Sequence, residues 1–448
     1  MAMADPHFRN AAAPAWPRRG QRLVHQLSAV DTGQWNAGQH AVAVSRGAVE
    51  GATPSAARRL RPGAAGMTRL ATAAAVSVPL PAAAPTPRSA DRIGFLDGFR
   101  AVAILAVLGF HYYARYADDP RGMYPFGDAW SGFPPFEYGY YGVHLFFAVS
   151  GFVITLTLMR CETVAEFAVR RLARLWPTML VCASLSYLFL LAFPWYFTPR
   201  AASFLPSLTF IDGRYFERLL PGTEFGWMDG AYWSLFVEIR FYALAAVLYF
   251  VHRTRFLAHT LSFFLLAVGA YWLLSALQQG HAAGVLRNLL ILAYLPWFLF
   301  GIAAHCLWSG RDGWAAALAA AAFAALAADV VAAGQWQELT VAAGVCGLFW
   351  LCLRFAAVRR VFSMRWLTAI GVSSYSLYLL HQYIGVTLTA MLARAWAVPP
   401  AAALGLPVLT AAAMLLAAGL IYRYWESPLN AWIVRWYLRG GGVAVPAR

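Results

Sequence analysis

Arg100 and His111 are the residues of this chain whose chemistry and spacing stand out first. They lie eleven positions apart in the first long apolar run, 98–116. In a helix, eleven steps of about 100° end within roughly 20° of the starting face, about 16 Å along the axis. A guanidinium and an imidazole on one face of a membrane helix suggest a channel with an anion-binding group at one end and a proton-accepting group at the other. The alternatives are an interfacial arginine anchor and a hydrogen-bonded interior histidine.

The composition indicates a membrane protein. Of the 448 residues, 60% are hydrophobic and only 12% are charged, whereas soluble domains carry about 25% charged residues. The formal net charge is +15, and no lysine occurs, so the basic residues are arginines. They lie at the ends of apolar runs, where they act as topology signals, and nucleic-acid binding is not expected. Cysteines and histidines show no CxxC or HExxH spacing, so no metal is expected.

Ten apolar segments from Asp97 onward are each about 20 residues long, the length that crosses a bilayer. They are 98–116, 141–160, 177–197, 231–252, 256–277, 286–306, 314–333, 337–356, 367–393 and 401–423. The sequence therefore predicts an all-α polytopic membrane helical bundle of about ten transmembrane helices. Apolar residues at helical spacing with arginines between them predict an interfacial amphipathic helix over 163–176.

The arginine bias of the loops predicts that both termini are cytoplasmic. Residues 1–91 are rich in Ala, Pro and Arg, and are expected to form a disordered cytoplasmic tail. An overextended start, with true initiation near Met67, is the other interpretation. The membrane domain is expected over 92–430, followed by a short basic cytoplasmic tail over 431–448.

This topology separates two groups of polar residues by depth. A level near the outer side holds two imidazoles and a carboxylate, His111, His144 and Glu238. The inner side gathers four arginines: Arg100, Arg160, Arg171 and Arg174. The pattern fits acyl transfer, because guanidiniums bind the phosphates of a coenzyme A thioester. A neutral histidine would take the proton of the acceptor hydroxyl, and a carboxylate such as Glu238 would fix its tautomer.

Six stretches of the chain resemble the integral-membrane acyltransferase 3 family, whose members O-acylate bacterial surface carbohydrates and some small glycosides. They are RIGFLDGFRAVAILAVLGFHYY (92–113), GVHLFFAVSGFVIT (142–155), RRLARLWP (170–177), YWSLFVEIRFY (232–242), SYSLYLLH (374–381) and YRYWESPL (422–429). The resemblance implies a multi-pass protein of the bacterial inner membrane. It would move an acetyl or similar short acyl group from cytoplasmic acyl-CoA, with acetyl-CoA as the expected donor, to a carbohydrate or glycoside hydroxyl. A separate envelope-biosynthesis protein could be a partner.

The resemblance also assigns roles to single residues. Arg100 and His111 match the essential pair of the family, and His111 is the expected catalytic base. Arg171 and Arg174 match a basic RxxR pair that is expected at the acyl-CoA phosphates. Asp97 is expected to cap the first helix, with the orientation of Arg100 as its alternative role.

Other positions match the family only in part. Glu238 matches the acidic residue of WSLxVE, and His381 matches the histidine that closes SYSLYLxH, although a plain interior role for His381 stays open. His144 stands where the family usually has Asp, and Arg240 adds a cation that is expected to pair with Glu238 or another acid. Ser150 is expected to be a helix-packing residue rather than a nucleophile. His144, Ser150 and His381 are thus expected beside the substrate or behind the catalytic groups.

A transporter or flippase for an acylated or glycosylated substrate is the alternative function. Intramembrane Arg, His and Glu also mark substrate pathways and proton relays. Many transporters contain internal repeats, and the sequence shows none. Substrate uptake without covalent change would distinguish this function from acyl transfer.

Overall fold

The computed structural model describes residues 93–130, 132–334 and 336–440. Within these ranges the chain is helical with connecting turns and has no strand. Eight helices are long and apolar enough to cross a membrane, by length and composition, and two shorter apolar helices, Leu295–Trp308 and Tyr383–Ala395, accompany them. The predicted polytopic helical bundle is confirmed. The predicted tail over 1–91 lies outside the described residues.

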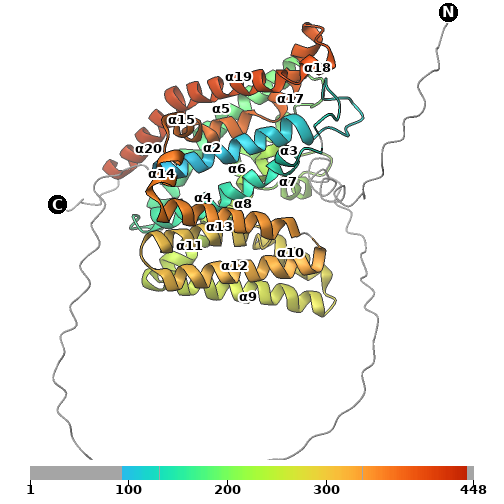
Figure 1. Ribbon diagram of the computed structural model, residues 1–448. Helices are drawn as coiled ribbons and strands as arrows, with labels where there is room; N and C mark the ends of the chain where they lie inside the picture. The colour runs from blue at the N-terminus through green and yellow to red at the C-terminus, as the bar shows by residue number, and fades with distance from the viewer. Residues whose placement is uncertain (1–92, 131, 335, 441–448) are drawn as a thin grey trace, which may run out of the picture. The chain divides into compact units, whose positions relative to one another are not determined.

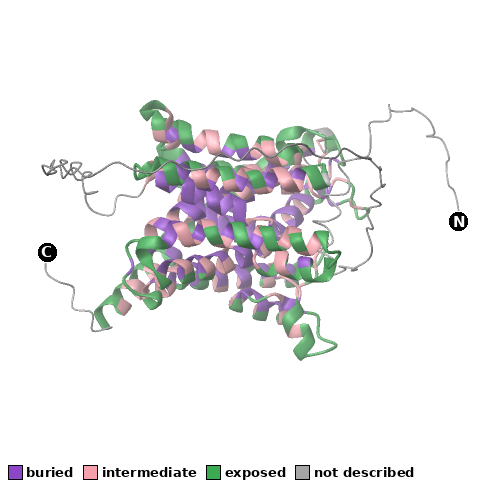
Figure 2. Cartoon of the chain, turned by 90° about the horizontal axis from the view of Figure 1, so that it is seen from below, coloured by how far each residue is buried: buried purple, intermediate pink, exposed green. Residues whose placement is uncertain are grey.

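The helices of the bundle run side by side (Figure 1), and their contacts define a central group with a flank on each side. The central group is α2 (Gly94–Gly109), α4 (Gly142–Leu158), α8 (Trp233–Val251) and α11 (Leu295–Trp308), and α11 joins this group to one flank. One flank is α9 (Phe256–Ala276), α12 (Asp312–Ala333) and α13 (Trp336–Arg354). The other flank includes α5 (Val164–Ala192), α19 (Leu406–Ile421) and α20 (Ser427–Gly440). The buried residues concentrate in the middle of the bundle, largely on α2, α4 and α11, whereas the periphery is mostly intermediate or exposed (Figure 2).

Two glycines allow α4 and α11 to approach closely. A Cβ atom on Gly151 would lie 2.1 Å from the Phe298 carbonyl oxygen, and one on Gly301 would lie 1.9 Å from the Ala148 carbonyl oxygen. Membrane helices come this close only where small residues stand at the crossing. The packing step that the sequence predicts at Ser150-Gly151 is therefore confirmed, with Gly151 as the residue at the contact.

The stretch 163–176 is not a separate interfacial helix, and this prediction is wrong. It forms the first half of α5, a single helix of 29 residues that continues through Pro177. Proline removes one intrahelical hydrogen bond, but apolar residues at helical spacing on both sides still bury a common face. Arg171 and Arg174 consequently lie about 10 to 15 Å along the helix from its start, within the bundle rather than in a loop.

The predicted span over 367–393 is a broken segment rather than one helix. It consists of α15 (Arg365–Val372), α16 (Ser374–Leu380) and α17 (Tyr383–Ala395). The first of these lies directly against α2, because Gly371 leaves space for the Asp97 carbonyl, which would be only 1.8 Å from a Cβ atom. The break leaves His381 at the junction of two helices, fully buried.

Two other boundaries differ from the expectation. The predicted span over 286–306 is divided into α10 (Gly280–Leu289) and α11, and the turn between them passes through Ile291 with a φ of 49°. The segment expected as a tail over 431–448 is helical as far as Gly440, as the second half of α20. Neither change affects the residues around the site.

Candidate functional site

A polar cavity lies between the central helices and α5. It encloses about 680 Å³, counting the space at its open mouth. Its charged and hydroxyl lining includes five of the expected site residues: Arg100, Ser150, Arg171, Arg174 and Glu238. The structure thus brings together side chains from α2, α4, α5 and α8 that are up to 138 positions apart in the sequence.

The electrostatics of this cavity favour an anion. Three guanidiniums line it against one carboxylate. Arg171 Nε is buried and has no hydrogen-bond partner among the described residues, although buried polar atoms are nearly always paired. Arg100 is oriented by Asp97, whose carboxylate accepts a hydrogen bond from Nη1 at 2.8 Å. Asp97 does not cap α2, because the helix begins after Ile93 without a side-chain cap; its alternative role is the observed one.

Glu238 is held by two hydroxyl groups. Ser150 Oγ donates to Glu238 Oε1 at 2.7 Å, and the Tyr242 phenol donates to the same oxygen at 2.6 Å. Among the described residues, Glu238 forms no hydrogen bond to a histidine, so the expected carboxylate–imidazole pair is not formed. Arg240 does not pair with an acid either; it donates to the carbonyl and side-chain oxygens of Asn288, at 3.2 and 3.1 Å.

His111 and His381 form a separate pair. Their ring centroids are 5.0 Å apart, edge to face. His111 lies in a π-helical turn at the end of α2, and the Tyr112 phenol donates to the His381 carbonyl at 2.9 Å, which ties the two segments together. The Tyr378 ring is 5.4 Å from the His381 ring and also lines the polar cavity. One aromatic ring therefore separates the histidine pair from the cavity.

His144 joins neither group. Its ring lies among aromatic side chains of α11 and of the 3-10 turn before α4, with centroids 4.6 Å from Trp297 and 5.0 Å from Tyr141. Nδ1 of His144 is buried without a partner among the described residues. The structure therefore places His144 apart from both His111 and Glu238.

Five hydroxyl-bearing cavity residues were not among the predicted site residues: Ser234, Tyr242, Ser374, Tyr375 and Tyr378. Ser234 and Tyr242 lie four positions before and after Glu238 on α8, so helical spacing could have placed them on its face. Tyr378 donates to the Ala231 carbonyl at 2.9 Å and accepts from Ser234 Oγ at 2.8 Å. The sequence feature that could have identified Tyr378 is its position three residues before His381 in the SYSLYLLH stretch, which places the two side chains on one face of a helix.

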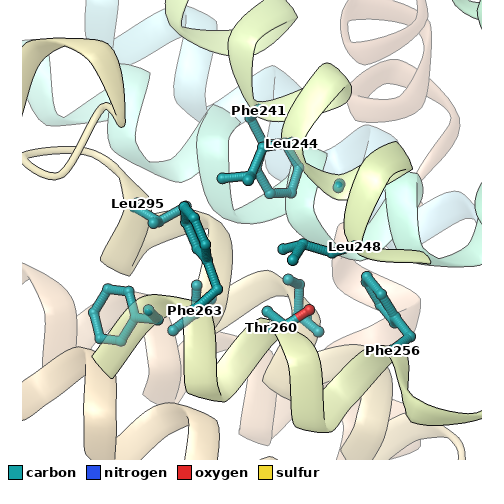
Figure 3. Close-up of a pocket in the computed structure, with 11 residues that line it drawn as sticks. Phe241, Leu244, Leu248, Phe256, Thr260, Phe263 and Leu295 are labelled. Carbon is teal, nitrogen blue, oxygen red and sulfur yellow. The ribbon is translucent and has the colours of Figure 1, made fainter. Parts of the chain in front are cut away.

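A second cavity offers no reactive groups. It lies between α8, α9 and α11 and is lined by apolar side chains and one hydroxyl, that of Thr260 (Figure 3). Within the described ranges, no cluster of three or more His, Cys, Asp or Glu residues could hold a metal ion. The polar cavity and the adjoining histidine pair thus carry the chemistry that the structure describes.

Comparison with known proteins identifies a family for most of the chain. A family model for an acyltransferase domain matches residues 93–438, which includes every residue of the cavity and the histidine pair. No curated protein and no solved structure matches the chain. Because the match extends over most of the sequence, the chain belongs to the acyltransferase 3 family of multi-pass membrane acyltransferases.

Proposed function

We propose that this protein transfers an acetyl or similar short acyl group from cytoplasmic acyl-CoA to a hydroxyl of a cell-surface carbohydrate or glycoside, in the bacterial inner membrane. The observation that carries the proposal is the cavity in which Arg100, Arg171 and Arg174 converge. Guanidiniums bind phosphate through paired hydrogen bonds, and the unpartnered Nε of Arg171 supplies a donor that an anionic ligand would satisfy.

The donor and acceptor would meet near His111. The phosphates of acyl-CoA would lie against the arginines, and the acyl arm would extend past Tyr378 toward the histidine pair. His111 takes the proton from the acceptor hydroxyl as its oxygen attacks the thioester carbonyl carbon. The carbon–sulfur bond breaks, the CoA thiolate leaves, and it receives the proton from the imidazolium. The products are an ester and free CoA, and no oxidant, metal or enzyme nucleophile is required.

Two adjacent arginines provide a matched test of donor binding. Arg171→Gln removes a guanidinium from the cavity, whereas Arg170→Gln removes one that pairs with Glu166 at 2.7 Å outside it. A charged hydrogen bond contributes about 1.5 to 3 kcal/mol, so Arg171→Gln should raise the KM for acetyl-CoA about tenfold or more. Arg170→Gln should change it less than about threefold, because Arg170 does not line the cavity and its partly buried pair with Glu166 is local to one helix. Equal KM values for the two variants would contradict the proposed donor site.

Two histidines provide the corresponding test of the base. In membrane vesicles given radiolabelled acetyl-CoA and an envelope carbohydrate fraction, His111→Ala should abolish ester formation. His144→Phe, which keeps an aromatic ring against Trp297, should retain most of it. Normal transfer by an inserted His111→Ala protein would exclude His111 as the base.

A further inference from the structure

We propose that His381 is a positioning residue that fixes the tautomer of His111. The inference rests on the proposed function, because it assigns a partner to the base of that reaction. The two rings lie edge to face at 5.0 Å, and each has a buried nitrogen without a hydrogen-bond partner among the described residues, Nδ1 of His111 and Nε2 of His381. Two orphaned nitrogens on neighbouring rings are unusual, because buried polar atoms are nearly always paired.

The tautomer of His381 follows from its own hydrogen bond. Nδ1 of His381 lies 2.8 Å from the Tyr378 carbonyl oxygen. A carbonyl only accepts hydrogen bonds, so Nδ1 must carry the proton. In the neutral ring, Nε2 then holds a lone pair and acts as an acceptor. His381 is fully buried, and its Nε2 therefore has no access to bulk water as an alternative donor.

His111 presents the complementary donor. If the proton of His111 resides on Nδ1, rotation of the His111 ring directs this proton to the lone pair on His381 Nε2. With ring centroids 5.0 Å apart, the two nitrogens can then come within about 3 Å, a hydrogen-bond distance. Nε2 of His111 is then unprotonated and free to accept the proton of the acceptor hydroxyl. His111 as a whole residue is of intermediate exposure, whereas its Nδ1 is buried. Fixing the tautomer of a catalytic histidine is the role that a carboxylate plays in hydrolase triads.

A contact between neighbouring residues fixes the relative position of the two rings. The Tyr112 phenol, next to His111 in the sequence, donates to the His381 carbonyl at 2.9 Å. Gly385 makes room for this phenol, because a Cβ atom there would lie 2.1 Å from the tyrosine oxygen. The contact joins the π-helical turn of α2 to the junction between α16 and α17. The pairing of the two imidazoles is thus built into the packing of the bundle.

Two amide substitutions separate positioning from a merely structural role. His381→Gln can place an amide oxygen near the position of Nε2 and so keeps an acceptor for His111. His381→Asn can place its amide nitrogen near the position of Nδ1 and keeps the hydrogen bond to the Tyr378 carbonyl, but removes the acceptor. We expect kcat to fall about tenfold or more in His381→Asn and to recover substantially in His381→Gln. The KM for acetyl-CoA should stay unchanged in both, because His381 does not line the cavity.

The measurement uses the full chain in membrane vesicles, with radiolabelled acetyl-CoA and the envelope carbohydrate fraction as probes. Thr387→Val serves as the control, because it alters another buried side chain without a partner on the following helix. A greater loss in His381→Gln than in His381→Asn, or wild-type kcat in both, would overturn the inference. If His111→Ala is inactive in the same experiment, such a result refutes only the role of His381; an active His111→Ala refutes the proposed base itself.

Discussion

The close contact between α4 and α11 predicts a large effect from adding a single methyl group. In Gly151→Ala, the new Cβ atom would lie 2.1 Å from the Phe298 carbonyl oxygen, whereas an ordinary contact begins at 3.4 Å. The obstacle is backbone rather than a flexible side chain, so the helices must separate by about 1.3 Å at this point. Overpacking of this kind costs about 1 to 3 kcal/mol. We therefore expect a lower Tm for the protein in detergent.

The same substitution should also reduce activity, because the residue before Gly151 is Ser150, which donates to Glu238 at 2.7 Å. Separation of α4 from α11 would displace Ser150 in the wall of the donor cavity, so the loss should be at least as large as that in Ser150→Ala. Gly269→Ala on α9 is the matched control, since nothing lies within 4 Å of its added Cβ atom. Thermal unfolding and label transfer should show losses in Gly151→Ala alone. If the two variants behave alike, the described packing of α4 against α11 is incorrect.

Three further predictions concern single side chains. Ser150→Ala should lower activity by about tenfold to a hundredfold without abolishing it, because it removes one hydrogen bond to a charged group, worth about 1.5 to 3 kcal/mol, while Tyr242 still donates to Glu238. Complete loss in the variant, with a trapped acyl-serine in the wild type, would make Ser150 a nucleophile. Glu238→Gln alters the group that accepts both hydroxyl hydrogen bonds, so it should lower kcat more than Ser150→Ala, and a reversed order would show that the carboxylate does not organise this part of the cavity. The hydrogen bond from the Arg121 guanidinium lowers the pKa of Asp119 in the folded protein. The ionised carboxylate therefore stabilises the fold at pH values above its unfolded pKa of about 3.9. This stabilisation is lost as the pH falls through the lower pKa of the folded state. Asp119→Asn should therefore lower Tm slightly at about pH 7, with the difference vanishing once the pH is below the lowered pKa of Asp119. A difference that stays constant with pH would contradict this assignment.

Much of the fold was predictable because the hydrophobic periodicity of a membrane chain is strong. Apolar runs of about 20 residues identify spans without tertiary information. The failures lie where packing overrides local pattern. Pro177 suggested a boundary, but α5 continues through it. The segment before and after His381 reads as one apolar run, yet it forms three helices, which hydrophobicity alone does not distinguish from one. Close neighbours contact it at Gly371 and Gly385, the Asp97 carbonyl and the Tyr112 phenol respectively.

The site was predictable as a set of residues but not as a set of partners. The motifs identified Arg100, Arg171 and Glu238, which the structure brings to one cavity. Counting residues from the ends of the predicted spans assigned Glu238 and His111 to the same depth in the membrane. Equal depth does not make two side chains neighbours, because it leaves open how the helices cross and which way they face. The structure instead pairs Glu238 with Ser150 through a hydrogen bond. Such pairings depend on helix rotation about its axis, which no single sequence encodes locally.

The central claim is that acyl-CoA donates an acyl group to a carbohydrate hydroxyl through this bundle. The most direct measurement uses the purified protein in proteoliposomes, with radiolabelled acetyl-CoA and the envelope carbohydrate fraction on opposite sides of the membrane. We predict that the label appears in the carbohydrate as a base-labile ester with wild-type protein, and that none appears with His111→Ala. Carbohydrate that crosses the membrane without gaining label, while acetyl-CoA remains intact, would contradict the account and indicate a transporter.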